Sequence, residues 1–546
     1  MKSIYIRLST LSLFFLLLVP GPVFSDEALD VIQKNEQLKK QKEVFERLEQ
    51  HRHETIPYVD VDKPVLLPSQ DEQCFEIKSI HETTITLLSQ EEKQALFDTY
   101  IGRCNTLTDL SNLARRLTAL YIEKGYITSQ VYLKPQNIIH GEVTLHAVEG
   151  TIESISPEKL YVNSAFWGQK QRHLNLRDLE RSIETINRLP SNHATMELSP
   201  GSEVGHTHVT IQNQPSRRIH GMLGLNNFGT HNTGKFQGTL RLFLDNPLKI
   251  NDQLSIHLNS TNKHFDGENS TGDSYAYSFP IRRLLTTLSY SKTKYEQDIP
   301  AGISTYKSQG STYTFTLDLA YKLYHDQHNR INIGAFLSRY KSSNFISDTL
   351  IETSSYTLSK TGARLDYLYQ TVGFYAFLEL QYSQGVDWFN AHNPTTLDEK
   401  YSLCTVDLSL AKQIASFQYT LDAHYQHSGD RLFSTNQISI GGPYSVRGYA
   451  KEGLNGNSGF YVRNELSYTS SHKFAGFFFP TCFVALDGGR IKKEEDSKGG
   501  TLLSDTIGIK LTADAVDLAI YYAMPLYKKD VSATQNFLGF WVNYRF

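Results

Sequence analysis

The stretch Tyr313–Leu323 reads Tyr-Thr-Phe-Thr-Leu-Asp-Leu-Ala-Tyr-Lys-Leu, and apolar and polar side chains alternate along it. An extended strand sends successive side chains to opposite faces, so one face is apolar and the other carries Asp318 and Lys322. A soluble sandwich would bury the apolar face in a core. Charge along the other face instead fits a watery lumen, with the apolar face turned to lipid. The pattern predicts a strand of a transmembrane β-barrel.

The same period of two continues from Arg217 to Phe546 and predicts a barrel over residues 216–546. Most of the 32 tyrosines and 29 phenylalanines of the chain fall here, which fits aromatic girdles at two membrane interfaces. We predict sixteen strands, an even number as in bacterial single-chain barrels. They begin near residues 218, 235, 252, 274, 286, 310, 331, 354, 373, 400, 416, 459, 477, 503, 516 and 535.

Residues 429–458 interrupt this alternation between the eleventh and twelfth predicted strands, and they are too many for a turn. The insertion contains Gly-Gly-Pro-Tyr-Ser-Val-Arg-Gly-Tyr at 441–449. Arg447 presents a planar fork suited to a bidentate carboxylate, Gly448 allows a sharp turn, and Tyr449 can anchor against a wall. A solvated arginine on an outer loop is the alternative for an isolated residue. The motif favours a barrel with moving internal parts over a simple pore.

The N-terminus predicts export. Lys2 and Arg7 precede an apolar run, and residues 1–25 fit a signal peptide cleaved after Ser25. Beyond it, no apolar run is long enough for a membrane-spanning helix. Residues 26–50 are rich in Glu, Lys, Gln and Leu and predict a charged helix that needs a host surface or cavity. Residues 51–70 contain three prolines and predict an extended linker, and we interpret His51-Arg52-His53 as solvated linker.

Two similar units follow, each predicted to form a strand–helix–strand–strand module. The first, residues 71–149, has a strand from Cys74 to Ile80 and a helix with leucines on one face. The second, residues 150–215, repeats the order with a helix that ends at Pro190. The first module also contains Cys74 and Cys104, which in an oxidising compartment could close a loop of about 30 residues.

The remaining composition bounds the function. A formal net charge of -3 gives no argument for nucleic-acid binding, and the 19 histidines show no metal-ligand spacing. No phosphate-binding loop is present. Cys404 and Cys482 lie in phase with lipid-facing neighbours and are interpreted as free apolar side chains. We therefore predict no cofactor, no metal and no nucleic-acid partner.

The motif Val446-Arg447-Gly448-Tyr449 resembles the signature loop of the superfamily that includes outer-membrane assembly barrels and two-partner secretion transporters. The likeness covers nearly the whole mature chain. Two polypeptide-transport-associated (POTRA) modules, rather than the five usual in bacterial assembly factors, resemble the two-partner secretion (TpsB) branch. So do the paired cysteines, Tyr121–Thr128, Pro135-Gln136 and Gly141–Gly150.

This resemblance implies an α+β pair of POTRA modules before a sixteen-stranded antiparallel transmembrane β-barrel, with an N-terminal plug helix. It implies an in-folded loop whose arginine contacts the acidic residue of an Asp-x-Gly motif. Asp487 and Gly489 fit, and parity turns Asp487 inward, whereas Ala485 replaces a usual Phe or Gly. It also implies that the final aromatic, Phe546, is a C-terminal signal for the barrel-assembly machinery that inserts the chain into outer-membrane lipid.

The implied function is export of one large unfolded exoprotein, a haemolysin, adhesin or contact-dependent inhibition toxin. The POTRA modules would capture it in the periplasm, and the outer-membrane barrel would pass it without nucleotide hydrolysis, with activation of the partner in some members. Three alternative functions fit the sequence less well. An assembly factor is disfavoured by the count of modules, and a small-molecule porin leaves the two modules without a role. A barrel hydrolase would need a Ser/His pair that no pattern indicates.

Overall fold

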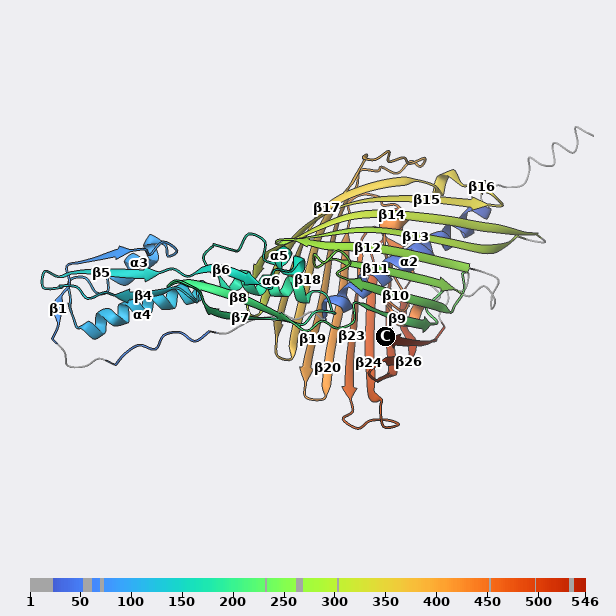
Figure 1. The fold of residues 1–546 in the computed structure, drawn as a ribbon. Helices are drawn as coiled ribbons and strands as arrows, with labels where there is room; N and C mark the ends of the chain where they lie inside the picture. Colours follow the sequence, from blue (N-terminus) through green and yellow to red (C-terminus); the bar gives the residue numbers. More distant parts are fainter. Residues whose placement is uncertain are drawn as a thin grey trace, which may run out of the picture.

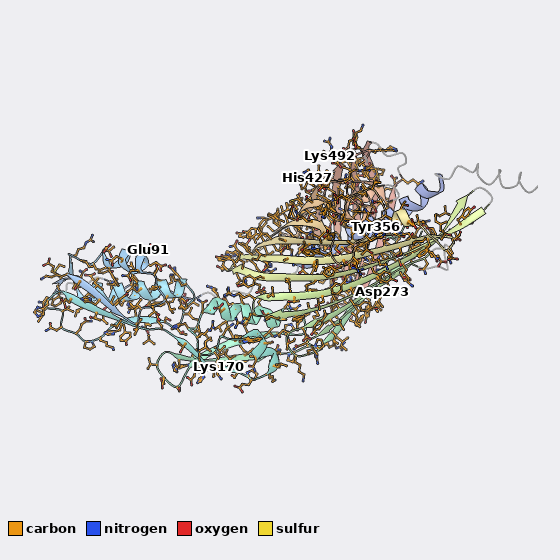
Figure 2. The ribbon with its side chains drawn as sticks, turned by 90° about the horizontal axis from the view of Figure 1, so that it is seen from above. Glu91, Lys170, Asp273, Tyr356, His427 and Lys492 are labelled. Atoms are coloured by element: carbon orange, nitrogen blue, oxygen red, sulfur yellow. A yellow bond between two sulfur atoms is a disulfide. The ribbon has the colours of Figure 1, made fainter. Side chains whose placement is uncertain are left out.

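The chain forms an elongated molecule in which two small modules extend from one end of a β-barrel (Figure 1). In Figure 2, Glu91 marks the far module, Lys170 the near module, and Tyr356 the barrel. The computed structural model describes residues 23–52, 61–68, 73–230, 233–261, 269–301, 304–450, 453–495, 497–529 and 535–546. Most of the predicted signal peptide and parts of the predicted linker, including His53, therefore lie outside the described residues.

Among the described residues, sixteen antiparallel strands close into one barrel, and the predicted strand number is confirmed. Each begins within six residues of its predicted start. The strands are β9 (Ile219–Asn226), β10 (Gln237–Asp245), β11 (Gln253–Thr261), β12 (Asn269–Ile281), β13 (Leu284–Ala301), β14 (Ser304–His325), β15 (Asn329–Ile346), β17 (Thr357–Thr371), β18 (Phe374–Val386), β19 (Ser402–Ile414), β20 (Phe417–His427), β23 (Gly459–Thr469), β24 (Phe479–Ile491), β25 (Gly500–Thr512), β26 (Val516–Lys529) and β27 (Phe537–Arg545). The two-residue strand β16 (Thr349–Leu350) pairs only with β15.

The barrel closes where β27 meets β9. Five residue pairs form this seam, from Trp541 opposite Asn226 to Arg545 opposite Met222. Beyond them, the backbone N–H of Phe546 donates to the carbonyl of Gly221, and the Gly221 N–H donates to the carbonyl of Phe546, both at 3.0 Å. Phe546 thus extends the seam by one further pair.

The alternation of the sequence sets the two faces of the wall. On β14, Phe315 and Tyr321 project outward and are 50% and 38% exposed. Asp318, on the other face, accepts a hydrogen bond from Arg364 Nη2 of β17 at 2.9 Å inside the barrel. Apolar side chains therefore face outward and charged ones face the lumen, as lipid and water require. Both barrel cysteines are free and exposed.

One helix lies inside the barrel. In Figure 1, α2 (Val23–Arg52) runs along the lumen, and it contacts β18, β19 and the loop between β20 and β23. No helix among the described residues is both long and apolar enough to span a membrane. The interpretation of Arg52 as solvated linker was wrong: it ends the helix, and its Nη2 donates to Asp422 of β20 at 2.6 Å. The barrel wall supplies this partner, which the local sequence cannot reveal.

The first module differs from its prediction in two ways. Its elements are β1 (Phe75–Glu76), β2 (Ser79–Thr83), α3 (Gln90–Phe97), β3 (Cys104–Asn105), α4 (Leu107–Glu123), β4 (Gln130–Leu133) and β5 (Glu142–Val148). The single strand predicted from Cys74 to Ile80 is two strands, because β1 pairs with β3 whereas β2 pairs with β5. The helix α3 was not predicted. A capping box begins it, since Ser89 and Glu92 each accept a backbone hydrogen bond from the other residue.

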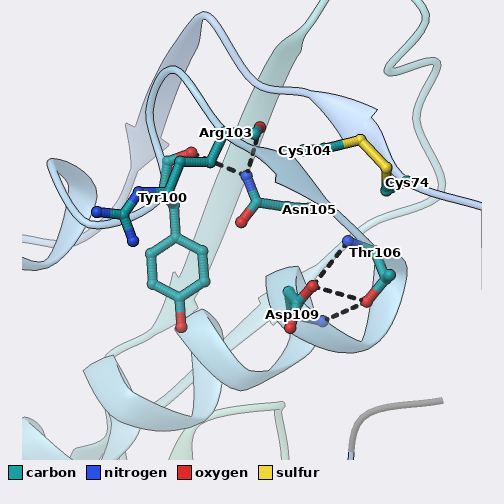
Figure 3. The surroundings of a disulfide bond; sticks show 7 residues. All are labelled: Cys74, Tyr100, Arg103, Cys104, Asn105, Thr106 and Asp109. Carbon is teal, nitrogen blue, oxygen red and sulfur yellow. Dashed lines mark hydrogen bonds between the residues drawn. A yellow bond between two sulfur atoms is a disulfide. The ribbon is translucent and has the colours of Figure 1, made fainter. Parts of the chain in front are cut away.

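The disulfide joins the edges of this module (Figure 3). Cys74 and Cys104 are bonded, with their Cα atoms 5.3 Å apart. They lie beside the two-residue β1–β3 ladder and next to the start of α4, where Thr106 and Asp109 form a second capping box. So short a ladder has few backbone hydrogen bonds of its own, so the covalent bond holds the entry of the chain against α4.

The elements of the second module follow the predicted order of strand, helix, strand and strand, with one additional helix. They are β6 (Thr151–Ser156), α5 (Leu160–Ala165), α6 (Leu176–Asn187), β7 (Ala194–Pro200) and β8 (His206–Asn213), with β8 central in the sheet. The short helix α5 was not predicted, so each module has two main helices where the sequence indicated one. Six residues are too few for a clear apolar periodicity.

Polar contacts fix the second module to the barrel and the linker to the first module. Glu184 of α6 accepts hydrogen bonds from Lys322 Nζ at 2.9 Å and Arg330 Nη1 at 3.2 Å, at the turn between β14 and β15. Residues 61–68 have no regular secondary structure and lie along α4. There the Leu67 N–H donates to Asn112 Oδ1 at 2.8 Å.

Candidate functional site

The insertion between β20 and β23 folds back against the inner wall. Two short strands, β21 (Ile438–Ile440) and β22 (Leu454–Gly456), pair with each other. The 3-10 turn Arg447–Tyr449 lies between them in the chain. Val446 is fully buried in an apolar cluster that joins these strands to Tyr461, Ile491 and Leu502 of the wall. The loop is therefore packed into the wall.

Arg447 binds two carboxylates of the wall. Its Nε and Nη2 donate to Oδ2 and Oδ1 of Asp487 on β24 at 2.7 and 2.8 Å. Its Nη1 donates to Oε2 of Glu465 on β23 at 3.0 Å. The structure thus brings together the arginine and the aspartate that the sequence singled out. The Asp487 side chain is fully buried, so this bidentate pair is shielded from water.

Gly448 and Tyr449 fit against an irregular part of the wall. A Cβ on Gly448 would lie 2.6 Å from the Cβ of Ser504 and 2.8 Å from the carbonyl carbon of Met524, so only glycine fits without a shift. The Tyr449 hydroxyl donates to the carbonyl of Tyr527 at 2.5 Å. Here the β25–β26 register shifts, next to a proline that has no N–H. The Tyr449 side chain is thus hydrogen-bonded to the wall where its strand pairing is irregular.

Two further residues complete the setting of the predicted Asp-x-Gly motif. A Cβ on Gly489 would lie 2.9 Å from the Phe460 carbonyl oxygen and 3.3 Å from Ile440, so the glycine lets β21 approach the wall. Ala485 carries no aromatic ring, but Phe483, two residues earlier on the same inward face, lies 5.9 Å from the Arg447 guanidinium carbon. The strand thus places an aromatic ring beside Arg447, but at position 483 instead of position 485.

Glu465 and Lys510 were missed in the sequence. Lys510 of β25 donates to Oε1 of Glu465, so the carboxylate joins the lysine and Arg447. Parity could have found Glu465, because it is in phase with Tyr461 and Arg463 on a strand predicted to begin at residue 459. The buried site thus contains two cations and two carboxylates.

The helix α2 touches the same loop. Gln41 Nε2 donates to the Ser439 carbonyl at 3.0 Å, and the Ser445 hydroxyl donates to Gln41 Oε1 at 3.2 Å. The Phe45 ring lies 5.7 Å from the Tyr444 ring. The residues just before Arg447 are therefore held on one side by the wall and on the other by the helix.

The C-terminal end of α2 binds strands β18 to β20 of the wall through arginines. Arg47 donates to Asp407 of β19 and lies 3.3 Å from Glu379 of β18. Arg52 donates to Asp422 of β20 at 2.6 Å. Guanidinium groups suit such pairs because they stay ionised. These contacts place the helix against strands β18 to β20.

The helix does not fill the lumen. On the far side, Arg241 of β10 donates to Glu46, so adjacent residues of α2 reach opposite walls. A cavity of about 380 Å³ remains between the helix and strands β12 to β20, with Lys40, Arg47 and Asp407 in its lining. Within the described residues, no cluster of three or more His, Cys, Asp or Glu side chains could hold a metal ion.

Comparison with known families identifies the barrel and both modules. Residues 205–511 match the family described as haemolysin secretion/activation protein ShlB/FhaC/HecB. The chain belongs to this family. Residues 75–150 match the POTRA domain of the ShlB type, and residues 144–200 match a further POTRA domain. The chain is therefore a two-partner secretion transporter of the outer membrane, and its POTRA domains lie in the periplasm.

Curated relatives of the ShlB/FhaC/HecB family match along most of their length. The outer membrane transporter CdiB of Dickeya dadantii is 27% identical over 512 residues, which cover 91% of this chain and 92% of the relative. The hemolysin transporter protein ShlB of Serratia marcescens is 27% identical over 471 residues, with 84% and 83% covered.

Solved structures agree with this assignment. CdiB from Escherichia coli has a TM-score of 0.84 at 25% identity, and the match covers 97% of this chain and 99% of CdiB. CdiB from Acinetobacter baumannii has a TM-score of 0.80 at 19% identity and shares the fold.

Proposed function

We propose that this chain exports one large exoprotein, which it captures unfolded in the periplasm and passes through the barrel after α2 leaves the lumen. One observation carries this proposal. The lumen is occupied by a separate helix, attached through polar and ionic contacts and through one apolar cluster in which Val44 and Leu48 pack on the wall. A pore closed in this way can open without rearrangement of its wall. The two POTRA modules stand at the entrance, where a periplasmic partner would arrive.

Capture by strand addition is supported by the topology of the modules. The strand order is β2-β5-β4 in the first POTRA module and β6-β8-β7 in the second, so β4 and β7 are edge strands. An edge strand presents backbone N–H and C=O groups to which an extended peptide can pair, with little demand on its sequence. An unfolded partner is suited to this mode of binding.

The partner proposed here is of the kind named in the relatives. Hemolysin and CdiB transporters share most of this chain, so an exoprotein of the haemolysin or contact-dependent inhibition type is the expected cargo. We propose no enzymatic step, because the transport requires only binding and a pore. Outer-membrane lipid and the barrel-assembly machinery are proposed as the partners of its own insertion.

In this function Arg447 is a positioning residue that holds the in-folded loop against the wall. The test is an Arg447→Ala strain, assayed for folded barrel in the outer membrane and for exoprotein in the medium. We expect at least tenfold less secreted exoprotein, with an Arg339→Ala variant on the outer part of β15 as control. Normal assembly with full secretion would overturn this role.

A second experiment separates export from barrel assembly. The exoprotein candidate is the product of a neighbouring reading frame for a very large exported protein. Depletion of the chain should then abolish secretion of that protein alone. A general loss of outer-membrane barrels on depletion would instead support an assembly factor.

A further inference from the structure

Four carboxylates lie close together on the inner wall, one on each of four adjacent strands, and the fourth is displaced by two residues because it stands opposite Ser409. They are Asp366 on β17, Glu379 on β18, Asp407 on β19 and Asp422 on β20, and we name them the acidic row. In the register, Asp366 stands opposite Glu379, and Glu379 stands opposite Asp407. Neighbouring strands are about 4.8 Å apart, so these like charges repel one another. The row is stable only with cations close to it.

The wall itself supplies partners for part of the row. His424 Nδ1 lies 2.6 Å from Asp407 Oδ1, and Arg364 Nε lies 3.4 Å from Asp366 Oδ2. Arg364, however, is shared with Asp318, to which it donates through both Nη atoms. Lys360 also lines the cavity beside the row.

The helix supplies the rest through Arg47 and Arg52, whose guanidinium groups bind Asp407 and Asp422. These contacts show the chemistry that the row accepts. Each is an arginine on a segment that is not part of the wall. In the resting barrel, the acidic row therefore already binds two arginines of the helix α2, which is not part of the wall.

These two arginines do not provide hydrogen bonds to every carboxylate oxygen of the acidic row. Asp366 Oδ1 and Glu379 Oε1 accept no hydrogen bond, although the two residues are only 6% and 2% exposed. Arg47 Nη1 lies 3.3 Å from Glu379 Oε1, as an ion pair without hydrogen-bond alignment. Buried acceptors without donors are unfavourable. The row thus has capacity for more cationic donors than α2 brings.

We propose that the acidic row is a binding site for arginine and lysine side chains of the exported polypeptide, and that Arg47 and Arg52 occupy it while the barrel is idle. This inference rests on the proposed export function. Basic segments of the cargo and the helix then compete for the same carboxylates. A cationic side chain is held briefly at the row and released to the next, because each contact is single and hydrated once the helix has left.

The facing wall gives the bound segment an orientation. Arg241 of β10, which binds Glu46 in the resting barrel, is released together with the row when α2 leaves. The freed Arg241 guanidinium then faces the acidic row across the lumen and contributes to a transverse field. An extended polypeptide is expected to turn its basic side chains toward β17 to β20.

The test uses the full-length chain with Arg47→Ala and Arg52→Ala, called the parent below. These substitutions remove the two helix arginines from the acidic row and leave its carboxylates intact. The chain is reconstituted in planar lipid bilayers, and a tetra-arginine peptide is added on the POTRA side. We expect the peptide to interrupt the current, with residence times at least tenfold longer than in a chain that also carries Asp366→Asn, Glu379→Gln and Asp407→Asn. Equal residence times in the two chains would overturn the proposal.

Matched controls separate the row from net charge. A third chain keeps the row and instead neutralises Asp348, Asp398 and Glu495, three exposed carboxylates outside the barrel wall, and it should be blocked like the parent. Block of the parent by a tetra-glutamate peptide, or loss of the tetra-arginine block in the third chain, would contradict the inference. Anisotropy of a labelled tetra-arginine peptide measures the same binding in detergent and needs no current. If the triple row variant fails to fold, Glu379→Gln alone is compared.

Failure here and failure of the proposed function give different results. The peptide block is measured without any exoprotein, so it can succeed in a chain that secretes nothing. Intact secretion by the triple row variant together with an unchanged peptide block would discard the acidic row and leave export standing.

Discussion

Arg447 of the in-folded loop and Arg47 of the lumenal helix bind carboxylates of the same barrel wall, yet they form two different joints. The Arg447 side chain is 4% exposed and pairs with Asp487 in a bidentate contact. The Arg47 side chain is 37% exposed and binds Asp407 through one nitrogen. Burial makes the first contact hard to break without loss of structure, whereas the second can exchange its partner for water. The difference indicates a fixed loop and a removable helix.

The comparison predicts its largest effect for Asp487→Asn. Arg447 would keep its charge in a buried site without its bidentate partner, and loss of one member of a buried pair costs about 3–5 kcal/mol. We expect a marked fall in the melting temperature of the barrel and at least tenfold less secretion. Thermal unfolding in detergent and exoprotein in the medium measure the two effects. Asp407→Asn is the control, and a similar fall in that variant would remove the distinction between the joints.

A smaller effect on stability, but a large one on the pore, is expected for Arg47→Ala combined with Arg52→Ala. The helix loses two charge-assisted hydrogen bonds, on the order of 2–4 kcal/mol of attachment, while the wall keeps its strand pairing. We expect a several-fold higher mean conductance in planar bilayers and a melting temperature that falls by less than in Asp487→Asn. An unchanged conductance would show that the remaining contacts, with the in-folded loop, with Arg241 and in the apolar cluster of Val44 and Leu48, are enough to retain the helix.

Lysine substitutions sharpen the comparison further. Lysine keeps the charge but offers a point donor instead of a planar fork. Arg447→Lys should therefore lose one or more of the contacts to Asp487 and Glu465 and secrete several-fold less. Arg47→Lys, where only one nitrogen makes a hydrogen bond and the other an ion pair with Glu379, should secrete close to the parent level. Secretion measured side by side tests this, and equal loss in both variants would contradict it.

The smallest effect is expected at a carboxylate outside the membrane, Glu149 of the first module. Its oxygens accept hydrogen bonds from the backbone and hydroxyl of Thr86, the N–H of Leu87 and the hydroxyl of Tyr121. Partial burial opposes ionisation, but these hydrogen bonds outweigh it and lower the pKa of Glu149 below its ordinary value. A depressed pKa stabilises the fold above the ordinary value, and this contribution is lost as the pH falls through the folded value.

Glu149→Gln should therefore lower stability by about 1 kcal/mol near neutral pH, the size of one hydrogen bond to a charged group in a half-exposed setting. The difference from the parent should begin to shrink as the pH falls below about 4, the ordinary value, and should vanish only below the lower pKa of the folded state. Melting of the periplasmic modules at a series of pH values measures it. A difference that stays constant across the series would show that packing, not charge, holds this residue.

The sequence predicted most of the barrel because its rule is local. Alternation along each strand is visible within a few residues, so the sixteen strands, the inward face of Asp487 and the position of the insertion followed from parity. Glu465 obeys the same rule and was missed only because the motif drew attention to one carboxylate.

Other parts could not be predicted, for physical reasons. The helices α3 and α5 have eight and six residues, too few for an apolar stripe, and only the capping box at Ser89 marks the first of them. Arg52 depends on Asp422, which is 370 residues away in the chain. Contacts between a lumenal helix and a wall are set by the fold as a whole, and no window of sequence contains both partners.

The way the linker lies along the first module gives the barrel a means of closing again. The Val65 carbonyl accepts a hydrogen bond from Arg115 of α4 at 3.0 Å, so the chain is held there. Twelve residues, 53–64, separate this point from Arg52, and they reach about 45 Å at full extension. A displaced α2 would thus remain tethered to the first module, at a local concentration on the order of millimolar. Under the proposed function, cargo would compete with a tethered ligand, and the helix would return to the lumen once the last segment of cargo has passed.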